Sequence, residues 1–464
     1  MIRLILGALV LTTALSFTVR ATDRPNIVLI LADDLGFECL SCYGGESVET
    51  PHLDALSASG MRFRHAHSQP ICTPSRVQIM TGIHNNRNYV KFGYLDPEAI
   101  TFAHVLRETG YRTFIAGKWQ LGGGFEAPAH FGFDDYCLWQ LTRRPSRYPN
   151  PGLEIKGKEV DFKNGEFGPD LVTDAIVDFL DADRGGAPFL VYYPMILPHW
   201  PFVPTPGSED WDPEMWQGAK GEPGGWRDSK YWPGMVRYTD KMVGKVVDAL
   251  EERGLRDNTL VIFTGDNGTY TGVTSRIGGR DYPGGKGSTR DNGTHVPFLA
   301  SWPGVIEAET LSDELVDFTD VFPTLVDVAG VEAPAGIEGV SLYPVLSGEG
   351  ERDKEFIYCW YHRNGDRDEA IELVRDRRSK LYANGDFFDL ETDPWEENPL
   401  GESALSTELA QRKEKLVAAL AEHRAVTRAS DPSIVRRQEE WAAEAKKNKG
   451  GKRATSKTKG KNAP

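Results

Sequence analysis

The sequence predicts an α/β fold: a large mixed, mostly parallel sheet sandwiched by helices, followed by a smaller C-terminal subdomain with an antiparallel sheet and a helix. Two observations support this prediction. Near-continuous apolar runs, typical of strands buried on both faces, alternate with segments of helical periodicity as far as about residue 341. From residue 342 the apolar segments are short, aromatic and separated by turn residues, which indicates an antiparallel sheet.

The large sheet is predicted from four apolar runs, which are residues 27–32, 111–116, 189–193 and 259–264. Five segments predict helices, and a glycine closes four of them: residues 51–59, 101–109, 168–182, 238–253 and 318–329. Thr101 is the expected N-cap of the second helix. The third is amphipathic, with one apolar face made of Leu171, Val172, Ala175, Ile176 and Phe179.

The small subdomain is predicted from strands at residues 356–361, 370–374, 380–382 and 387–390, with a helix over residues 407–425 packing on them. We therefore divide the chain into a signal peptide (1–21), an α/β domain (22–341), an α+β subdomain (342–426) and a polar to basic tail (427–464). The tail is expected to be disordered from about residue 446 because it is rich in Lys, Gly, Ser and Thr.

The net charge and the N-terminal residues limit the possible partners and the cellular location of the protein. The formal net charge is −15, and a basic tail with no acid from Lys446 onward makes the remainder more acidic still, which argues against nucleic acid as a partner. Met1-Ile2-Arg3 followed by apolar residues 4–17 is typical of a secretory signal peptide and too short for a confident membrane span. We expect an exported, periplasmic or secreted protein with no stable membrane insertion after cleavage; an uncleaved anchor is the alternative. Export permits disulfides, and Cys39 and Cys42 are close enough in sequence to pair locally.

One stretch, residues 70–76, concentrates reactive side chains, because Cys72 lies two residues before Pro74 and four before Arg76. Pro74 biases the residue before it away from the helical region, so the segment should enter extended, and residues 77–80 predict a first helical turn. Cys72 would then lie just before a helix N-terminus, which favours an anion, and Arg76 adds a cation suited to a tetrahedral oxyanion. A buried structural Cys beside a surface Arg is the alternative.

Each of the four predicted strands ends in polar side chains. Because the carboxyl ends of parallel strands lie at one edge of a sheet, these side chains should converge there. They are Asp33 and Asp34, Lys118, His199, and Asp266 and Asn267. A turn or a cap explains any one ending, but four together predict a site.

The oxygen-bearing members of this set suit a hard cation such as Ca²⁺ or Mg²⁺. Taken singly, the carboxylate pair is also typical of an N-cap and the Asn-Gly dipeptide of a turn. Lys118, His199 and Lys286 could supply positive charge to an anionic group. Lys286 lies in the glycine-rich loop 284–289, where an ordinary solvated lysine is the alternative.

Together these pieces resemble the type I sulfatases of the alkaline-phosphatase-like superfamily, over about residues 24–424. The matching motifs occur in the family's order: Ala32-Asp33-Asp34-Leu35-Gly36, Cys72 to Arg76, Gly117-Lys118-Trp119, Pro198-His199, Gly265-Asp266-Asn267-Gly268 and Gly285-Lys286-Gly287. Residues 389–396 are similar to the motif of the family's C-terminal domain.

The resemblance implies a sulfuric ester hydrolase in which a formylglycine-generating maturation enzyme oxidises Cys72 to formylglycine (3-oxoalanine). One hydroxyl of its hydrate would attack sulfur in line and displace the alcohol, and the second would expel sulfate and restore the aldehyde. The resemblance also implies one bound Ca²⁺, or Mg²⁺, with the ligands Asp33, Asp34, Cys72, Asp266 and Asn267.

By the same resemblance, Arg76 would hold the formylglycine oxygens. Lys118, His199 and Lys286 would bind sulfate, with His199 or Lys286 protonating the leaving oxygen. Gln120 departs from the family, which usually has His two residues after the strand-end lysine. Gln cannot take up a proton near neutral pH, so another base acts, or Gln120 only orients the hydrate, or turnover is slow.

The expected substrate is a sulfated carbohydrate rather than a simple aryl sulfate, because a Trp-rich insertion at residues 201–234 can stack on sugars. Packing of these rings within the loop itself is the alternative. Candidate recognition residues are Trp200, His362, Arg363 and His295, and His295 could equally be structural.

Two rival functions stay open at the level of the sequence. One is a phosphomonoester or phosphonate-ester hydrolase, which would usually need more metal or cations than the ligands of one ion suggest. The other is a non-catalytic binder of sulfated glycans, in which Cys72 is left unmodified; Gln120 favours this reading.

Overall fold

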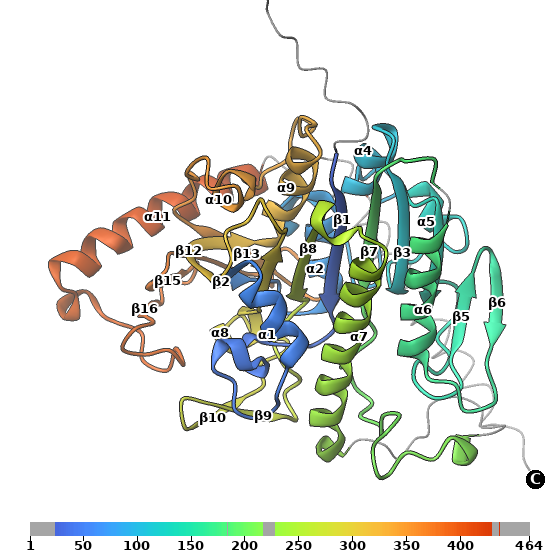
Figure 1. The fold of residues 1–464 in the computed structure, drawn as a ribbon. Helices are drawn as coiled ribbons and strands as arrows, with labels where there is room; N and C mark the ends of the chain where they lie inside the picture. The colour runs from blue at the N-terminus through green and yellow to red at the C-terminus, as the bar shows by residue number, and fades with distance from the viewer. Residues whose placement is uncertain (1–23, 183, 217–227, 429–435, 437–464) are drawn as a thin grey trace, which may run out of the picture.

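The structure is a computed structural model that describes residues 24–182, 184–216, 228–428 and 436. The expected signal peptide and most of the basic tail lie outside these residues. A ten-stranded mixed sheet spans the molecule in the order β12-β2-β11-β8-β1-β7-β3-β4-β5-β6 (Figure 1). Its strands are β1 (Asn26–Ala32), β2 (Met61–His67), β3 (Arg112–Lys118), β4 (Asp135–Trp139), β5 (Gly152–Ile155), β6 (Lys158–Asp161), β7 (Phe189–Pro194), β8 (Thr259–Gly265), β11 (Phe298–Ser301) and β12 (Thr310–Asp317).

The four predicted strands are confirmed, and they are neighbours in the sheet. β8, β1, β7 and β3 pair in parallel, so their carboxyl ends reach one edge together. The flanking strands make the sheet mixed: β11 runs antiparallel to β8 and β2, and β5 runs antiparallel to β4. The predicted mixed, mostly parallel architecture is therefore confirmed.

Helices cover both faces of this sheet. They are α1 (Pro51–Ala58), α2 (Cys72–Thr81), α3 (Asn85–Asn88), α4 (Phe102–Glu108), α5 (Ala127–His130), α6 (Gly168–Asp181), α7 (Trp232–Glu252), α8 (Asp291–Thr294), α9 (Val321–Val328) and α10 (Tyr343–Leu346). Side chains alternate along β1 between two cores: Ile27, Leu29 and Leu31 join one, and Val28 and Ile30 join the other. A β-strand that serves two cores must be apolar throughout, which explains its uninterrupted run.

All five predicted helices are confirmed, with shifted details. Thr101 caps α4 as expected, in a capping box with His104. In α6 the buried stripe passes through Val172, Ile176 and Leu180, so the predicted face is rotated. α7 begins at Trp232, six residues earlier than predicted, and the predicted 318–329 helix is a 3₁₀ turn (Phe318–Asp320) followed by α9.

α2 differs from the prediction in its start. The helix begins at Cys72 itself, and only Ile71 before it is extended. Pro74 lies inside the first turn, where its missing N–H would have had no intrahelical partner, so the residue before it can also be helical. Gly82 ends the helix with φ 66°.

The C-terminal antiparallel sheet is also confirmed, in the order β13-β14-β15-β16. Its strands are β13 (Ile357–Tyr361), β14 (Ile371–Arg375), β15 (Ser379–Tyr382) and β16 (Phe387–Asp389), and α11 (Thr407–Arg428) packs on it. A hairpin of β9 (Thr274–Ile277) and β10 (Arg280–Pro283) projects from the large domain. All five cysteines are free, so Cys39 and Cys42 are not paired. Within the described ranges no helix is long and apolar enough to cross a membrane.

Candidate active site

The predicted convergence at the sheet edge is present. Asp33 and Asp34 follow β1, Lys118 ends β3, and Asp266 and Asn267 follow β8, and all five are buried. His199 lies five residues beyond β7 and exposes 13% of its side chain. The parallel strands thus bring together residues that are more than 200 positions apart in sequence.

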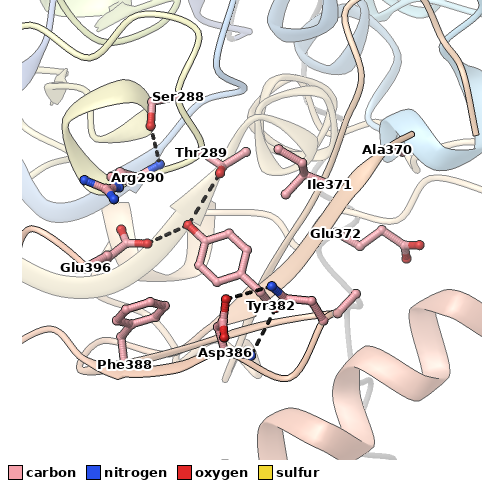
Figure 2. Close-up of a pocket in the computed structure, with 12 residues that line it drawn as sticks. Ser288, Thr289, Arg290, Ala370, Ile371, Glu372, Tyr382, Asp386, Phe388 and Glu396 are labelled. Carbon is pink, nitrogen blue, oxygen red and sulfur yellow. Dashed lines mark hydrogen bonds between the residues drawn. The ribbon is translucent and has the colours of Figure 1, made fainter. Parts of the chain in front are cut away.

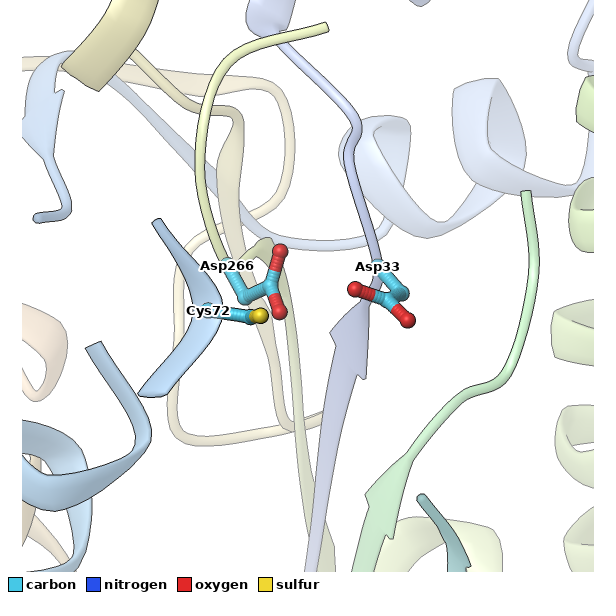
Figure 3. A group of neighbouring side chains, drawn as sticks. All are labelled: Asp33, Cys72 and Asp266. Carbon is cyan, nitrogen blue, oxygen red and sulfur yellow. The ribbon is translucent and has the colours of Figure 1, made fainter. Parts of the chain in front are cut away.

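Cys72 faces this edge from the first turn of α2. It is 2% exposed, and its Sγ lies with one carboxylate oxygen each of Asp33 and Asp266 in a group whose atoms are all within 4.8 Å of one another (Figure 3). In this view the thiol, which comes from α2, lies beside the carboxylate of Asp266, and that of Asp33 faces them from the end of β1. A helix N-terminus that faces such a site favours negative charge on the residue at its start.

Each of the three carboxylates is paired with a cation. Arg76 donates through Nη2 to Asp266 at 3.1 Å and through Nη1 to the carbonyl of Lys118 at 2.9 Å. The Lys118 ammonium donates to both oxygens of Asp33 at 2.8 and 2.7 Å, and that of Lys286 lies 2.6 Å from Asp34. The side chains predicted to carry negative and positive charge thus form one connected network.

The cations of the network stabilise the ionised form of Asp33 more than that of Asp266. Burial opposes ionisation of Asp33, but its neighbours, first Lys118, hold its pKa below the ordinary value. Burial and the charge of Asp33 raise the pKa of Asp266 to about 7, although Arg76 opposes this shift. The two carboxylates compete for the same cations, so a further cation between them would favour ionisation of both.

The side chain of Asn267 supports a cation site here. Its Nδ2 donates to Asp34 Oδ1 at 2.9 Å, which turns the amide oxygen away from that carboxylate. The amide oxygen of Asn267 is buried, and among the described residues it accepts no hydrogen bond. An unsatisfied buried oxygen next to three buried carboxylates is a donor set that suits a hard divalent cation such as Ca²⁺ or Mg²⁺.

His199 is oriented by its own neighbour. Its Nδ1 contacts the carbonyl oxygen of Trp200, which can only accept, so Nδ1 carries the proton. The other nitrogen, Nε2, lies 3.7 Å from Asp34 Oδ2 and faces the network. Burial, and then the charge of Lys286, hold the pKa of His199 well below its ordinary value. A proton that reaches Nε2 is therefore easily given up.

Gln120 stands beside the thiol. Its amide oxygen accepts a hydrogen bond from Thr73, the residue after Cys72, at 3.3 Å. Its backbone has φ 62° and donates to the carbonyl of Gln140, which has φ 63° at the end of β4. Asp34 also has a positive φ, of 68°. Left-handed conformations of non-glycine residues are costly, and they gather here at the site edge of the sheet.

Arg147 belongs to the network and was not predicted. It comes from the loop between β4 and β5, is 1% exposed, and stacks its guanidinium 3.9 Å from the centroid of Trp139. Its Nη1 lies 3.7 Å from Asp33 Oδ2. Its charge also lowers the pKa of His199. In the sequence it is one arginine among others in a polar loop, and no motif or neighbouring apolar run marks it as a site residue.

The structure does not bring His295 to the network. Its Nε2 bonds to the carbonyl of Arg64 at 2.8 Å, its Nδ1 lies 3.2 Å from Asp291, and its ring stacks on Phe37 at 3.9 Å. These contacts favour the structural reading of this residue.

The other candidate recognition residues lie on two loops, one after β7 and one after β13. Trp200 is half-buried and packs against the core on its face of the sheet. The subdomain loop after β13 reaches the segment that follows α3, since Tyr89 donates to the carbonyl of Arg363 at 2.8 Å and the Arg363 guanidinium lies 4.5 Å above Phe92. His362 accepts from the amide of Asp366 at 2.7 Å, within its own turn.

Two tryptophans of the insertion expected to stack on sugars pack against the rest of the chain. Trp211 meets Phe167 edge to face at 5.3 Å, and Trp232 is 2% exposed at the start of α7. Trp226 lies outside the described residues. The packing alternative holds for Trp211 and Trp232.

Known proteins match both parts of the chain. The family model described as "Sulfatase" matches residues 25–331, and the one described as "N-sulphoglucosamine sulphohydrolase, C-terminal" matches residues 286–424. Arylsulfatase A of Bos taurus is 32% identical over 415 residues, which cover 80% of this chain and 77% of the relative. The N-acetylglucosamine-6-O-sulfatase of Bacteroides thetaiotaomicron is 25% identical and covers 92% and 91%. Among solved structures, Ps i-CgsB in complex with k-i-k-neocarrahexaose aligns with a TM-score of 0.69 at 28% identity, covering 84% of this chain and 92% of that one.

Proposed function

The chain belongs to the sulfatase family, and from this membership we propose that it removes sulfate from a carbohydrate ester with a formylglycine made from Cys72. As a member of this family it is a sulfuric ester hydrolase. The observation that carries the proposal is the placement of Cys72 Sγ at the start of α2, in one group with the carboxylates of Asp33 and Asp266. A carbohydrate is favoured because one similar enzyme is named for N-acetylglucosamine 6-O-sulfate and one similar structure holds a neocarrahexaose.

We assign one Ca²⁺, with Mg²⁺ as the other possibility, to a site made by Asp33, Asp34, Asp266, Asn267 and the residue derived from Cys72. The buried carboxylates and the unsatisfied Asn267 oxygen support this assignment. When bound, such an ion lowers the pKa of a hydroxyl and stabilises charge on sulfate oxygens.

The cations around the thiol would bind the sulfate group. Lys118 has three N–H donors and uses two on Asp33, so it retains one for a sulfate oxygen. Lys286 likewise keeps donors beyond its bond to Asp34, and the buried Arg147 adds a forked guanidinium at the same edge. Arg76, fixed by Asp266, would hold the oxygens of the formylglycine.

Proton transfer is assigned to His199, with Gln120 as an orienting group. Because Nδ1 of His199 is bound to the Trp200 carbonyl, Nε2 is the atom that would protonate the leaving oxygen. Its lowered pKa makes the protonated form a strong donor. Gln120 can orient a hydroxyl next to Thr73 but cannot remove its proton.

Substrate recognition, maturation and location complete the proposal. We assign Arg363 and Trp200, with His362 behind them, to the rim that contacts the sugar. We further propose that the chain is exported to the periplasm or the cell exterior and meets a formylglycine-generating enzyme on the way.

The decisive experiment is mass spectrometry of the tryptic peptide from His65 to Arg76, after co-expression with a formylglycine-generating enzyme. An aldehyde or its hydrate at Cys72 is the expected result, and Cys72→Ala should then abolish hydrolysis of 4-nitrophenyl sulfate. Only unmodified Cys, with a known sulfatase converted in parallel, would overturn the mechanism and favour a non-catalytic binder.

Two assays on the same preparation test the other parts. Faster hydrolysis of 4-nitrophenyl phosphate than of the sulfate would favour the phosphoester alternative. Removal of divalent cations should lower the melting temperature as well as the activity, and Ca²⁺ should restore both. An unchanged melting temperature would contradict the cation site.

A further inference from the structure

A cavity of about 420 Å³ lies at the seam between the large domain and the C-terminal sheet, and it has the size of a ligand site (Figure 2). Ser288, Thr289 and Arg290 line it from the loop that carries Lys286. Ile371, Tyr382 and Phe388 line it from the sheet. No residue of the proposed active site lines this cavity, so it requires a separate explanation.

The cavity is connected to the active site by two elements. Gly287 donates to the carbonyl of Pro70 at 2.8 Å, so one short loop binds the segment leading into Cys72, places Lys286 on Asp34 and lines the cavity. On the sheet side, Ile371 of β14 is the register partner of Tyr361 of β13, so the two side chains share one face. β13 ends at Tyr361, directly before His362 and Arg363 of the proposed rim, so the strand that pairs with the cavity residue Ile371 leads into that rim.

The lining combines an apolar platform with polar groups. Ile371 is 43% exposed and lies beside the ring of Tyr382, which is fixed because its hydroxyl donates to Glu396 at 2.5 Å (Figure 2). Ser288 and Asn384 add neutral polar side chains. A fixed ring and an aliphatic side chain, with hydroxyl and amide groups at the edge, suit the C–H face and the hydroxyls of a sugar.

The charges of the lining limit the ligand further. Glu396 is neutralised by Lys380 at 2.8 Å, and Glu372 points away from the centre, toward Tyr358 at 3.0 Å. Arg290 is exposed, and within the described part of the chain no ion pair engages its guanidinium. Because Asp386 keeps a carboxylate on the same wall, a neutral or singly sulfated sugar fits better than a polyanion.

We propose that this cavity is a second carbohydrate subsite, which binds a sugar unit linked to the one whose sulfate reaches Cys72. The proposal rests on the proposed function and narrows it, because the preferred substrate becomes a sulfated oligosaccharide rather than a free sulfated monosaccharide. Ile371 and Tyr382 would support the ring, and Arg290 would contact an acidic substituent on it.

The kinetic test compares two substrates on the formylglycine-containing enzyme. From a panel of carrageenan-, chondroitin- and heparin-derived hexasaccharides we take the one hydrolysed fastest, and 4-nitrophenyl sulfate, which has no second sugar, is the reference. The ratio of the two kcat/KM values should fall about tenfold in Ile371→Ala and in Arg290→Ala. Leu311→Ala, on an equally exposed strand position, and Arg280→Ala, on the β10 hairpin, are matched controls that should keep the ratio. An unchanged ratio in both cavity variants would overturn the subsite while leaving the sulfatase assignment intact.

A binding measurement separates the subsite from catalysis. Calorimetry of the Cys72→Ser protein with each hexasaccharide of the panel should show at least one that binds, and adding Ile371→Ala should weaken that binding about tenfold. If no ester is hydrolysed but this difference is found, the proposed function fails and the subsite stands. If none of the hexasaccharides binds, the subsite proposal is wrong.

Discussion

Gln120 and Gln140 follow the ends of two neighbouring strands, β3 and β4. Both have left-handed backbones, with φ 62° and 63°, and a backbone hydrogen bond joins them. This conformation costs a non-glycine residue about 1 kcal/mol or more. The surrounding fold pays that cost at a position that directs the Gln120 amide to Thr73, next to Cys72.

Replacing Gln120 with His should therefore introduce a base at Thr73, the residue next to the proposed nucleophile. We expect kcat to rise by about tenfold or more at pH 8, because a positioned base contributes about a hundredfold or more in other enzymes. Since only neutral imidazole can accept a proton, the gain should appear as pH rises through about 6.5. The measurement is the pH profile of kcat for 4-nitrophenyl sulfate. Gln140→His is the matched control, because Gln140 has a similar left-handed φ after the neighbouring strand, and its kcat should show no such rise with pH. If Gln120→His leaves the pH profile of kcat unchanged, the enzyme lacks no base at this position.

Arg147 makes a second prediction at this scale. Arg147→Met keeps an extended side chain over Trp139 but removes the charge near Asp33, so kcat/KM should fall about a hundredfold. Arg147→Lys should recover part of the loss because it restores the charge without the fork. Millimolar guanidinium added to the Met variant should also restore activity. A loss of activity that neither change relieves would indicate a purely structural role.

At the scale of single elements, β3 and β7 approach unusually closely. Gly117 in β3 has φ 124°, and a Cβ at this position would lie 1.9 Å from the carbonyl oxygen of Pro194 in β7. No side chain can be accommodated unless the strands separate, and the next residue is Lys118. The glycine therefore sets the position of Lys118, the cation proposed to bind sulfate.

Gly117→Ala should destabilise the fold by about 3 kcal/mol, through both the clash and the left-handed backbone. Gly110→Ala is the matched control, because Gly110 has φ 97° with nothing within 4 Å of the added Cβ. It should cost only about 1 kcal/mol. Urea midpoints compare the two, and equal losses would show that the close approach contributes nothing.

The strands that the sequence predicts best are those whose residues are nearly all buried. β8, β1, β7 and β3 are buried on both faces, so apolar runs reveal them. β2 was missed because Arg62 and Arg64 interrupt its apolar residues, and β6 because it has almost none. The site residues that directly follow apolar runs were predicted by that adjacency, whereas Arg147 reaches the site by stacking on Trp139, a contact that only the folded chain defines.

At the scale of the whole molecule, a buried charged cluster joins the two sheets. Arg375 of β14 pairs with Asp291, which contacts His295, and the ring of His295 lies 4.8 Å from that of His67. Arg375 Nη1 also lies 3.4 Å from His67 Nδ1. The division of the chain at residue 341 stays a prediction, but this cluster shows that the parts on either side share buried contacts.

Because of this cluster, the stability of the fold should decrease as the pH is lowered. Burial, then Arg375 and His295, hold the pKa of His67 well below 6.5, against the opposing charge of Asp291. His67 is thus neutral when folded and binds a proton when unfolded, so its contribution is present above about pH 6.5 and is lost as pH falls. His67→Gln should flatten the dependence of the melting temperature on pH between 6.5 and 4.5. His52→Gln, at an exposed histidine of α1, should keep the wild-type slope, and an equal slope in both variants would exclude His67 as the cause.

The enclosure of Cys72 also sets an order of events during synthesis. The thiol is 2% exposed in the folded chain, where it is grouped with Asp33 and Asp266, so the maturation enzyme proposed above would have to reach it before folding is complete. Asp266 is added 194 positions after Cys72, which at roughly 5–20 residues per second leaves an interval on the order of ten seconds or more. Throughout that interval β8 and Asp266 are missing, so this side of the enclosure around the thiol cannot form. Under the proposed function, the extent of Cys72 modification would depend on the rate of oxidation relative to the rate of translation, and slower elongation should raise it.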